Sequence, residues 1–455
     1  MNIEQLISTL DSIIWGVPLM VLLVGTGIFL TIRMRAIQIR GFRHSIDIVA
    51  GKYDNPADPG EVSHFKALAT ALSATIGTGN IVGVAAAILA GGPGAVFWMW
   101  VTALVGMATK FTSCTLAVHF RRIDSNGEVH GGPMHFIERG MGPSFRWLAV
   151  LFAVFTALAS LGIGNMFQSN NVATAINTLV LGSGNAASQW LCTVVGICSA
   201  LLVGLVIIGG IKRIAQFSSM IAPVMCLFYF GAGIIILLRN YELIIPGFKL
   251  IFTHAFTAPE SVAGGLLGGV IKSGVARGLF SNEAGMGSAP IAHGAARTSE
   301  PIREGLVAML GPFIDTIVIC SITALVIVCT KAYEVEATSG QLTGIAFNIG
   351  LPGSEWMVST GIIFFAFSTL ISWSYYGDRA VDYLFGHKGI LPYRIIYVIC
   401  VFIGAIGNFP TVISFCDAMN GLMAIPNLIA LVVLSPIVAQ LSKNYFGKRK
   451  NNRNR

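Results

Sequence analysis

The sequence predicts an all-α protein that crosses a membrane many times. Of its 455 residues, 54% are hydrophobic and only 11% are charged, and the mean hydropathy is +0.75. A soluble domain needs a polar surface and does not have this composition. The hydrophobic residues also gather in runs of about 20, the length at which an α-helix spans the hydrocarbon core. These observations exclude a soluble globular fold.

Eleven such runs follow one another along the chain. They lie near residues 13–31, 66–90, 95–118, 145–179, 188–210, 217–238, 260–296, 304–329, 355–377, 393–407 and 417–440. The run at 145–179 is longer than an upright span, so we expect it to tilt. The first run ends in Arg33-Met34-Arg35 and not in a small-residue cleavage site. We therefore expect residues 13–31 to stay in the protein as an extra N-terminal helix.

Lysine and arginine are distributed unevenly between the connections. If alternate connections face the cytoplasm, 23 of the 29 Lys and Arg residues lie on that side, and the other side has only Arg239, Lys249 and Lys331. Because cytoplasmic loops retain positive charge, the N-terminus is predicted outside and the C-terminus inside the cell. The basic cytoplasmic tail, residues 441–455, fits contact with anionic membrane lipid better than nucleic-acid binding.

The sequence offers little support for an enzyme. All eight cysteines lie in or at the ends of predicted spans without a C-x-x-C pair, as expected for small buried hydrophobic residues. The eight histidines form no H-E-x-x-H cluster, and no Ser/His/Asp set is placed as a nucleophile. Nothing in the sequence implies a cofactor or an obligate protein partner.

Ten runs remain when the first is set aside, and they divide into two sets of five within one transmembrane domain. Residues 66–238 form the first set and residues 260–440 the second, joined by a loop at 239–259. Five spans each give the two sets opposite orientations, so we predict an inverted repeat. In each set the first helix has a glycine-rich interruption, at residues 77–80 and at residues 281–287.

These two interruptions predict a transport site. Hydrocarbon offers no hydrogen-bond partner, so unpaired backbone groups at membrane depth must line an enclosed cavity. Broken helices at corresponding positions of two repeats indicate a substrate and ion site near the middle of the membrane. A packing surface of small residues is the alternative, but packing alone does not call for the adjoining Thr78 and Asn80. A channel filter is a further alternative, although no segment repeats as a short pore loop.

Several stretches resemble one known family. Residues 91–106, Gly-Gly-Pro-Gly-Ala-Val-Phe-Trp-Met-Trp-Val-Thr-Ala-Leu-Val-Gly, look like the signature of the alanine or glycine:cation symporter family, the bacterial sodium:alanine symporters. Residues 74–80, 131–134 and 277–290 support the resemblance, which extends over residues 30–440. It implies eleven helices with a leucine-transporter-type 5+5 inverted repeat plus one extra N-terminal helix, in the bacterial cytoplasmic membrane.

The resemblance also implies a function and a coupling ion. Members of this family take up alanine or glycine, driven by sodium and in some members by protons. We therefore expect a secondary symporter that works by alternating access, with sodium as its coupling ion. A proton-coupled transporter, or a carrier of another small solute such as a nucleobase or a sugar, is the alternative within the same fold.

The first interruption is predicted to bind the substrate carboxylate. Where the helix at 66–90 unwinds, a new helix N-terminus begins, and its free N–H groups and positive dipole end suit an anion. The amides of Gly77, Thr78 and Gly79 are the candidates, and the side chain of Asn80 could join them. Glycine permits a positive φ and a close approach of the ligand.

The second interruption is predicted to receive the substrate ammonium. Carbonyls at the end of a helix, the negative end of its dipole, suit a cation. Ser281 belongs to this group, and Phe280 would form the apolar side of the pocket.

Two intramembrane carboxylates leave alternatives open. Glu283 is a functional candidate because a charge at membrane depth is costly, or it pairs with Lys272 or Arg277 and fixes the broken segment. Asp315 has the same two alternatives, with a structural role favoured.

Two further helices provide candidates. Gln168 belongs to a polar cluster in the run at 145–179 and can bind either end of a zwitterion, since it both donates and accepts. A water-exposed helix end is the alternative for Gln168. Thr369 and Trp373 lie one turn apart on one helix face. We expect Thr369 to bind sodium and Trp373 to form a pocket wall, with a membrane-interface position as the alternative for Trp373.

Similarity to the shared fold completes the sodium site. Sodium would lie between the hydroxyls of Ser368 and Thr369 and the backbone carbonyls of Ser73 and Ile76. Hard oxygen ligands of this kind suit a small cation.

Overall fold

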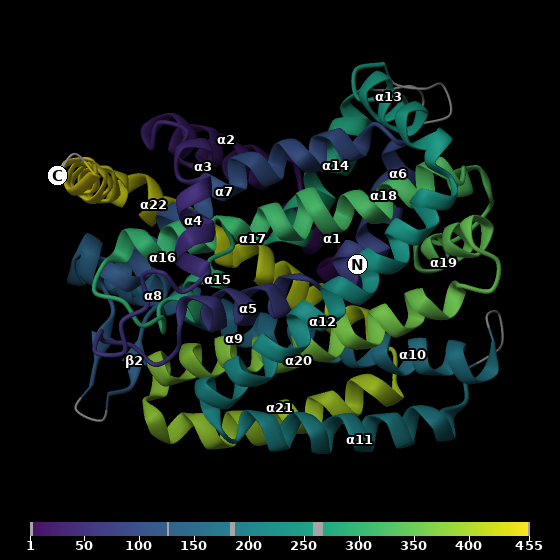
Figure 1. Cartoon of the computed structure of the whole chain (residues 1–455). Coiled ribbons are helices and arrows are strands. Elements are labelled where there is room, and N and C mark those ends of the chain that lie inside the picture. The colour runs from purple at the N-terminus through teal and green to yellow at the C-terminus, as the bar shows by residue number, and fades with distance from the viewer. Residues whose placement is uncertain (1–2, 125–126, 183–186, 258–266, 454–455) are drawn as a thin grey trace.

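The computed structural model describes residues 3–124, 127–182, 187–257 and 267–453. In these residues the protein is a bundle of long helices, most of which run side by side (Figure 1). The strands described form one short hairpin, in which β1 (Arg122–Ile123) pairs antiparallel with β2 (Val129–His130).

The first half of the chain runs from the N-terminal span to the helix that ends at Arg239. Its helices are α1 (Ile3–Ile14), α2 (Val17–Arg33), α3 (Ile37–Arg40), α4 (Phe42–Val49), α5 (His64–Thr75), α6 (Val82–Gly91), α7 (Ala95–His119), α8 (Pro133–Phe136), α9 (Arg146–Leu161), α10 (Phe167–Leu181), α11 (Gln189–Ile207) and α12 (Gly210–Arg239). The second half consists of α13 (Ile244–His254), α14 (Leu267–Asn282), α15 (Ala289–His293), α16 (Pro301–Ala308), α17 (Leu310–Pro312), α18 (Ser321–Cys329), α19 (Ser339–Gly350), α20 (Glu355–Phe385), α21 (Ile390–Ile406) and α22 (Pro410–Arg453).

Short segments of tighter or wider helix join some of these elements. The 3₁₀ turns are η1 (Thr78–Asn80), η3 (Pro143–Phe145), η5 (Tyr241–Leu243), η7 (Ala332–Glu334) and η8 (His387–Gly389). The π-helical segments are η2 (Ile137–Met141), η4 (Gly162–Met166) and η6 (Phe313–Cys320). Because π segments inside longer helices are frequent at functional sites, η4 and η6 are of interest below.

Ten of the eleven predicted spans correspond to candidate membrane spans among the described residues, and the eleventh overlaps two shorter helices. Nine helical stretches are long and apolar enough to cross a membrane, and the pair α5 and α6 makes a tenth, bent by 65° at η1. The predicted run 260–296 corresponds to α14 and α15. Residues 260–266 of that run, residues 258–259 of the joining loop and residues 454–455 of the basic tail lie outside the described residues.

The outer helices expose apolar side chains, as a membrane protein requires. Leu201 and Leu205 of α11 are each 63% exposed, and Leu391 of α21 is 65% exposed. A helix that faced water would carry polar residues on that side. These faces therefore suit contact with lipid, and they support a protein that crosses the membrane several times.

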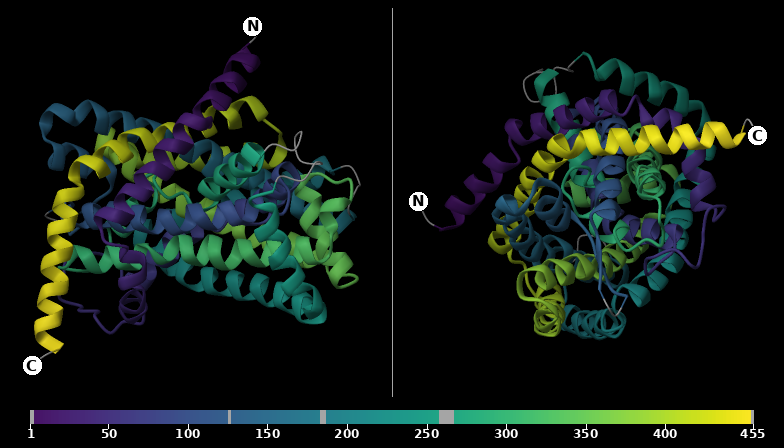
Figure 2. Two further views of the ribbon diagram at one scale, coloured as in Figure 1. Left: turned by 90° about the horizontal axis from the view of Figure 1, so that it is seen from above. Right: turned by 90° about the vertical axis from the view of Figure 1, so that its left-hand side faces the viewer.

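The two ends of the bundle differ in what they carry. One end holds α4, α8, α16 and the β1–β2 hairpin, together with the end of α22 (Figure 1). We call it the basic end, because the connections that are rich in Lys and Arg meet there. The C-terminal part of α22, the last helix, runs across this end and not along the bundle (Figure 2). The opposite end holds α13 and α19 (Figure 1).

Candidate functional site

A central cavity lies where the two interruptions meet. Its volume is ≈ 20 Å³, room for little more than one water molecule. It is lined by Ala74, Thr75, Gly77, Thr78, Gly79, Ile163, Gln168, Phe280, Glu283, Thr369, Trp373 and Asn420. Seven of the residues that the sequence predicted for the site therefore line this one cavity, namely Gly77, Thr78, Gly79, Gln168, Phe280, Thr369 and Trp373. Parts of the chain almost 300 residues apart converge here, as a shared site requires.

The first interruption presents backbone donors to this cavity. The N–H of Gly77 donates to Oδ1 of Asn80 (3.0 Å), and the N–H of Asn80 donates to the carbonyl of Gly77 (3.3 Å). Within the described part of the chain, no acceptor faces the N–H groups of Thr78 and Gly79. Both groups stand at the start of the helix that continues into α6, where an anion is favoured.

The glycines of the first interruption serve close packing. Gly77 has a φ of −130°, and Gly79 has no positive φ either, so neither glycine uses the positive φ that its lack of a side chain permits. A Cβ atom on Gly77 would lie 3.2 Å from Oγ1 of Thr369, and one on Gly79 would lie 3.4 Å from the ring of Phe280. A side chain at either position would therefore fill the space beside the cavity.

The second interruption uses left-handed backbone, and its neighbours pair some of its polar groups. The φ angles are 50° at Glu283, 101° at Gly285 and 95° at Gly287. The N–H of Ala284 donates to Oδ1 of Asn282 (3.0 Å), and Nδ2 of Asn427 donates to the carbonyl of Gly285 (2.7 Å). Glu283 of this segment lines the cavity, whereas Gly285 and Gly287 do not.

Glu283 lines the cavity but does not pair with the cations that the sequence suggested. Its carboxylate accepts a hydrogen bond from Oγ of Ser288 (2.6 Å) and is within reach of the Trp373 indole. Among the described residues, the cation that acts on it is Lys110 of α7, and not Lys272 or Arg277. Lys110 is 2% exposed. Its position inside a predicted span was the signal that the sequence analysis did not use.

Asp315 of η6 joins the two interruptions. Its carboxylate accepts hydrogen bonds from Nδ2 of Asn80 (2.7 Å), Oγ of Ser281 (2.9 Å) and Oγ1 of Thr316 (2.6 Å). Asn80 and Ser281 were predicted to face the substrate, but both side chains turn to Asp315 and neither lines the cavity. The geometry therefore fits the structural role that was favoured for Asp315.

The oxygen atoms of the predicted sodium site gather at the end of α5. Oγ1 of Thr369 donates to the carbonyl of Ser73 (3.0 Å), and Oγ of Ser368 lies 3.3 Å from the same carbonyl. Oγ of Ser73 is buried without a partner among the described residues. Ile76 follows at the end of α5 and is fully buried. Because hydroxyl hydrogens rotate, Ser368 and Thr369 can turn their lone pairs to a cation beside the Ser73 carbonyl.

Gln168 and Trp373 also line the cavity. Nε2 of Gln168 donates to the carbonyl of Ile163 (3.3 Å), while its Oε1 is buried without a partner in the described residues. Trp373 is 1% exposed, and a Cβ atom on Gly164 would lie 2.5 Å from it. Trp373 is thus a cavity wall, and a position at the membrane interface does not apply.

Asn420 of α22 is a cavity residue that the sequence analysis missed. Its Oδ1 is also buried and has no partner among the described residues. The other polar residues of the run at 145–179 bind neighbouring helices: Asn165, Ser169 and Asn170 donate to carbonyls of Tyr397, Val401 and Gly404. Gln168 and Asn420 therefore add unpaired acceptors to the cavity that Thr78 and Gly79 also line.

A second hollow approaches the cavity from the end opposite the basic end. It measures ≈ 300 Å³ and is lined by residues of α6, α10, α19 and α20, including Val82 and Asn171. Asn171 follows Gln168 by about one turn of α10, so the hollow reaches to within one helical turn of the cavity. We call it the vestibule.

The basic end is closed by contacts between the segments that flank the two broken helices. Val62 and Ala296 form a parallel backbone bridge. The guanidinium of Arg121 donates to the carbonyls of Pro59 (2.7 Å), Gly294 (2.9 Å), Ala296 (2.5 Å) and Thr298 (2.7 Å).

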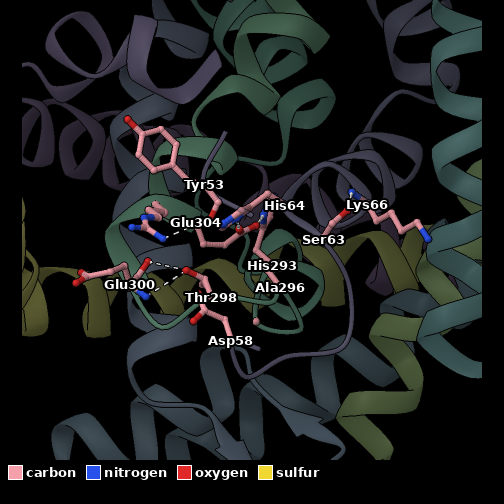
Figure 3. Close-up of polar contacts among 12 residues, drawn as sticks. Tyr53, Asp58, Ser63, His64, Lys66, His293, Ala296, Thr298, Glu300 and Glu304 are labelled. Atoms are coloured by element: carbon pink, nitrogen blue, oxygen red, sulfur yellow. Dashed lines mark hydrogen bonds and ion pairs between the residues drawn. The ribbon is translucent and has the colours of Figure 1, made fainter. Parts of the chain in front are cut away.

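A buried carboxylate completes this closure. Figure 3 shows Glu304 of α16 beside His64, the first residue of α5, and His293, the last residue of α15. Nδ1 of each imidazole is hydrogen-bonded to the carboxylate, with a distance of 2.5 Å for His293. All three side chains are at most 1% exposed. We call these contacts, together with those of Arg121, the clasp.

Comparison with known proteins gives a consistent result. The model of the sodium:alanine symporter family matches residues 1–455. The sodium/alanine symporter AgcS of Methanococcus maripaludis is 46% identical over 99% of this chain and 99% of its own length. The probable sodium/glutamine symporter GlnT of Bacillus subtilis is 34% identical over 98% of this chain and 92% of its own length. The amino-acid carrier protein AlsT of the same organism is 36% identical over 98% of this chain and 93% of its own length.

Proposed function

Because the chain belongs to the sodium:alanine symporter family, a family of transporters and not of enzymes, we propose that it carries alanine or glycine into the cell together with sodium. The observation that supports this most is the central cavity, because residues with unpaired donors and residues with unpaired acceptors both line it. A zwitterionic amino acid needs donors for its carboxylate and acceptors for its ammonium within a few ångströms of each other.

The two charged ends of the substrate have separate partners in this proposal. The N–H groups of Thr78 and Gly79 bind the carboxylate. The free side-chain oxygens of Gln168 and Asn420 accept hydrogen bonds from the ammonium, with help from carbonyls at the end of α14. An unpaired buried polar group costs about 1–3 kcal/mol, so a ligand that satisfies four of them at once gains from each.

The cavity walls favour a small side chain. The rings of Phe280 and Trp373 limit a space of ≈ 20 Å³, so even alanine needs some movement of these walls. Each further methylene group of the substrate requires a larger movement of these walls, and steric exclusion rejects larger substrates effectively. We therefore propose alanine and glycine as substrates, although one relative is named for glutamine.

Sodium binds next to the substrate in this proposal. The hydroxyls of Ser368 and Thr369 and the carbonyls of Ser73 and Ile76 supply the oxygen atoms. Ser73 belongs to α5, which ends two residues before Gly77, and a Cβ atom on Gly77 would lie 3.2 Å from Oγ1 of Thr369. A sodium ion at this position holds the first interruption in place. Sodium binding is therefore coupled to binding of the substrate carboxylate.

Alternating access follows from the two ends of the bundle. The clasp closes the basic end, while the vestibule opens at the other end. With the basic end in the cytoplasm, the central cavity is closed toward the cytoplasm. The proposal retains eleven spans in a leucine-transporter-type repeat, with the N-terminus outside and the C-terminus inside a bacterial cytoplasmic membrane. The clasp has to break before substrate leaves to the cytoplasm.

Counterflow in proteoliposomes tests the proposed function. Purified protein is reconstituted, the vesicles are loaded with unlabelled alanine, and entry of labelled alanine is followed with sodium and pH varied separately. We expect saturable entry that depends on sodium and is inhibited by glycine but not by glutamine. Entry that follows pH and ignores sodium would support the proton-coupled alternative, and entry without saturation would support a channel.

A further inference from the structure

A separate cavity at the basic end has a uniformly positive lining. It measures ≈ 560 Å³ and lies between the end of α2, the short α3 and the C-terminal part of α22. Four of its lining residues are the cations Arg33, Arg35, Arg40 and Lys443, and none is acidic. We call it the basic cavity.

Two other cavities at the same end also contain cations, but acidic residues lie among them. One is lined by the cations Lys212, Arg379, Lys388 and Arg394 and also by Glu61 and Glu128, and Arg394 pairs with Asp378 at 2.6 Å. The other contains Asp124, Glu138 and Asp382 beside its arginines. In the described residues, no carboxylate forms an ion pair with any of the four cations of the basic cavity. Of these three cavities, the basic cavity is the one whose lining has no acidic residue.

The protein holds these cations together at a cost. Arg35 has a φ of 54° and Ala36 a φ of 49°, a left-handed conformation that is uncommon outside glycine and is strained. The guanidinium of Arg40 donates to the carbonyl of Met34 (3.0 Å) and lies 5.5 Å from the centre of the Phe446 ring. Burial, and then the charge of Arg35, lower the pKa of Arg40. An anion would relieve the mutual repulsion.

The basic cavity lies at the level of the membrane surface. Arg33 is the last residue of the N-terminal span, and the neighbouring Ile32 is 73% exposed, so an apolar face continues directly below the cavity. The C-terminal part of α22 crosses the end of the bundle above it (Figure 2). This part is fastened to α4 by a hydrogen bond of 2.7 Å between His44 and Tyr445.

We propose that the basic cavity binds the phosphate headgroup of an anionic phospholipid. The four cations bind the phosphate, and the acyl chains lie along the exposed apolar face of α2. Basic residues next to the membrane are attracted to anionic lipid, and arginine suits the oxygen atoms of a phosphate. Free inorganic phosphate offers the same oxygen atoms without the acyl chains.

Lipid binding to the full-length protein tests this proposal. Purified protein in a neutral detergent is titrated with phosphatidylglycerol, and bound lipid is counted by native mass spectrometry, with phosphatidylcholine as the neutral comparison. Arg33→Gln with Arg35→Gln removes two charges from the cavity. Arg43→Gln with Lys448→Gln removes two exposed charges at the same end that do not line it, and serves as the matched control.

We expect one phosphatidylglycerol to bind more tightly than phosphatidylcholine. The cavity variant should weaken it about fivefold per charge, while the control stays within twofold of the wild type. Equal loss in both variants would mean a diffuse charge effect and would overturn the proposal. Complete displacement of the lipid by millimolar inorganic phosphate would assign the cavity to free phosphate instead. An unchanged melting temperature of the cavity variant shows that it is folded.

Discussion

The two interruptions of the helices look alike in the sequence but differ in the structure. At the first, Gly77, Thr78 and Gly79 line the central cavity, and the N–H groups of Thr78 and Gly79 have no partner among the described residues. At the second, left-handed residues turn the chain, the side chains of Asn282 and Asn427 bind part of the backbone, and Glu283 alone of residues 281–287 lines the cavity. A glycine-rich break is therefore not by itself a binding segment. The two breaks differ in how much of the broken backbone lines the cavity.

The difference assigns the two breaks separate roles. In the proposed mechanism the first break binds the substrate, and the second contributes Phe280 and Glu283 to the cavity lining. Asp315 keeps the two in register, since it accepts hydrogen bonds from Asn80 of the first and Ser281 of the second. Substitutions at the first break should therefore affect transport, and substitutions at the second should affect stability.

The largest effect is expected for Gly79→Val. A Cβ atom there lies 3.4 Å from the Phe280 ring, so the two methyl groups of valine enter the cavity and cover the free N–H groups. Alanine uptake should fall to background while the amount of protein in the membrane is unchanged. Gly83→Val on the same helix is the matched control, because a Cβ atom on Gly83 meets nothing within 4 Å. Alanine uptake by the Gly79→Val variant would show that the first break is only a packing surface.

Gly285→Ala should show the opposite pattern. Its φ of 101° is strained for alanine, and the new Cβ atom would lie 2.5 Å from Leu23. We expect a loss of roughly 1–3 kcal/mol in stability, seen as a lower melting temperature of the purified protein, with the alanine affinity of the folded fraction retained. Gly268→Ala at the start of α14 has open space and should melt like the wild type. A normal melting temperature with lost affinity would make the second break a ligand segment after all.

The sodium site is tested by two substitutions at one position. Thr369→Ala removes an oxygen atom and should raise the sodium concentration for half-maximal uptake about tenfold. Thr369→Ser retains the oxygen atom and should stay close to the wild type. Identical sodium dependence in all three proteins would remove Thr369 from the site.

A smaller effect is expected for Gln168→Leu. The substitution removes one acceptor with a similar volume, so alanine affinity should fall about fivefold, the value of one hydrogen bond. Binding of labelled alanine at saturating sodium measures it. An affinity equal to that of the wild type would leave Asn420 as the free side-chain acceptor for the ammonium.

The smallest effect concerns pH and lies away from both breaks. The hydrogen bond to Asp382 raises the pKa of His130 above its ordinary value. The imidazolium therefore stabilises the folded protein below a pH of about 6.5, and this contribution is lost as the pH rises through the pKa in the folded state. His130→Gln should flatten the melting temperature between pH 6 and pH 8, whereas a substitution of the exposed His387 should not. An unchanged profile would show that the pair adds nothing to stability.

The sequence predicted the elements of this site better than their orientation. Helical runs follow from composition, and Thr369 and Trp373 reach one cavity because they lie one turn apart on α20. The direction of the Asn80 and Ser281 side chains could not be predicted, because it depends on Asp315, which lies more than thirty residues from Ser281 and more than two hundred from Asn80. The clasp was missed for the same reason. His64 and Glu304 are 240 residues apart, and no periodic pattern links them.

The central claim is that the first break binds the substrate carboxylate, and a cryo-EM structure of the protein with alanine and sodium tests it most directly. We expect alanine in the central cavity, with its carboxylate within hydrogen-bonding distance of the N–H groups of Thr78 and Gly79 and its ammonium near Gln168. Alanine bound instead in the vestibule, or with its carboxylate at the second break, would contradict the claim.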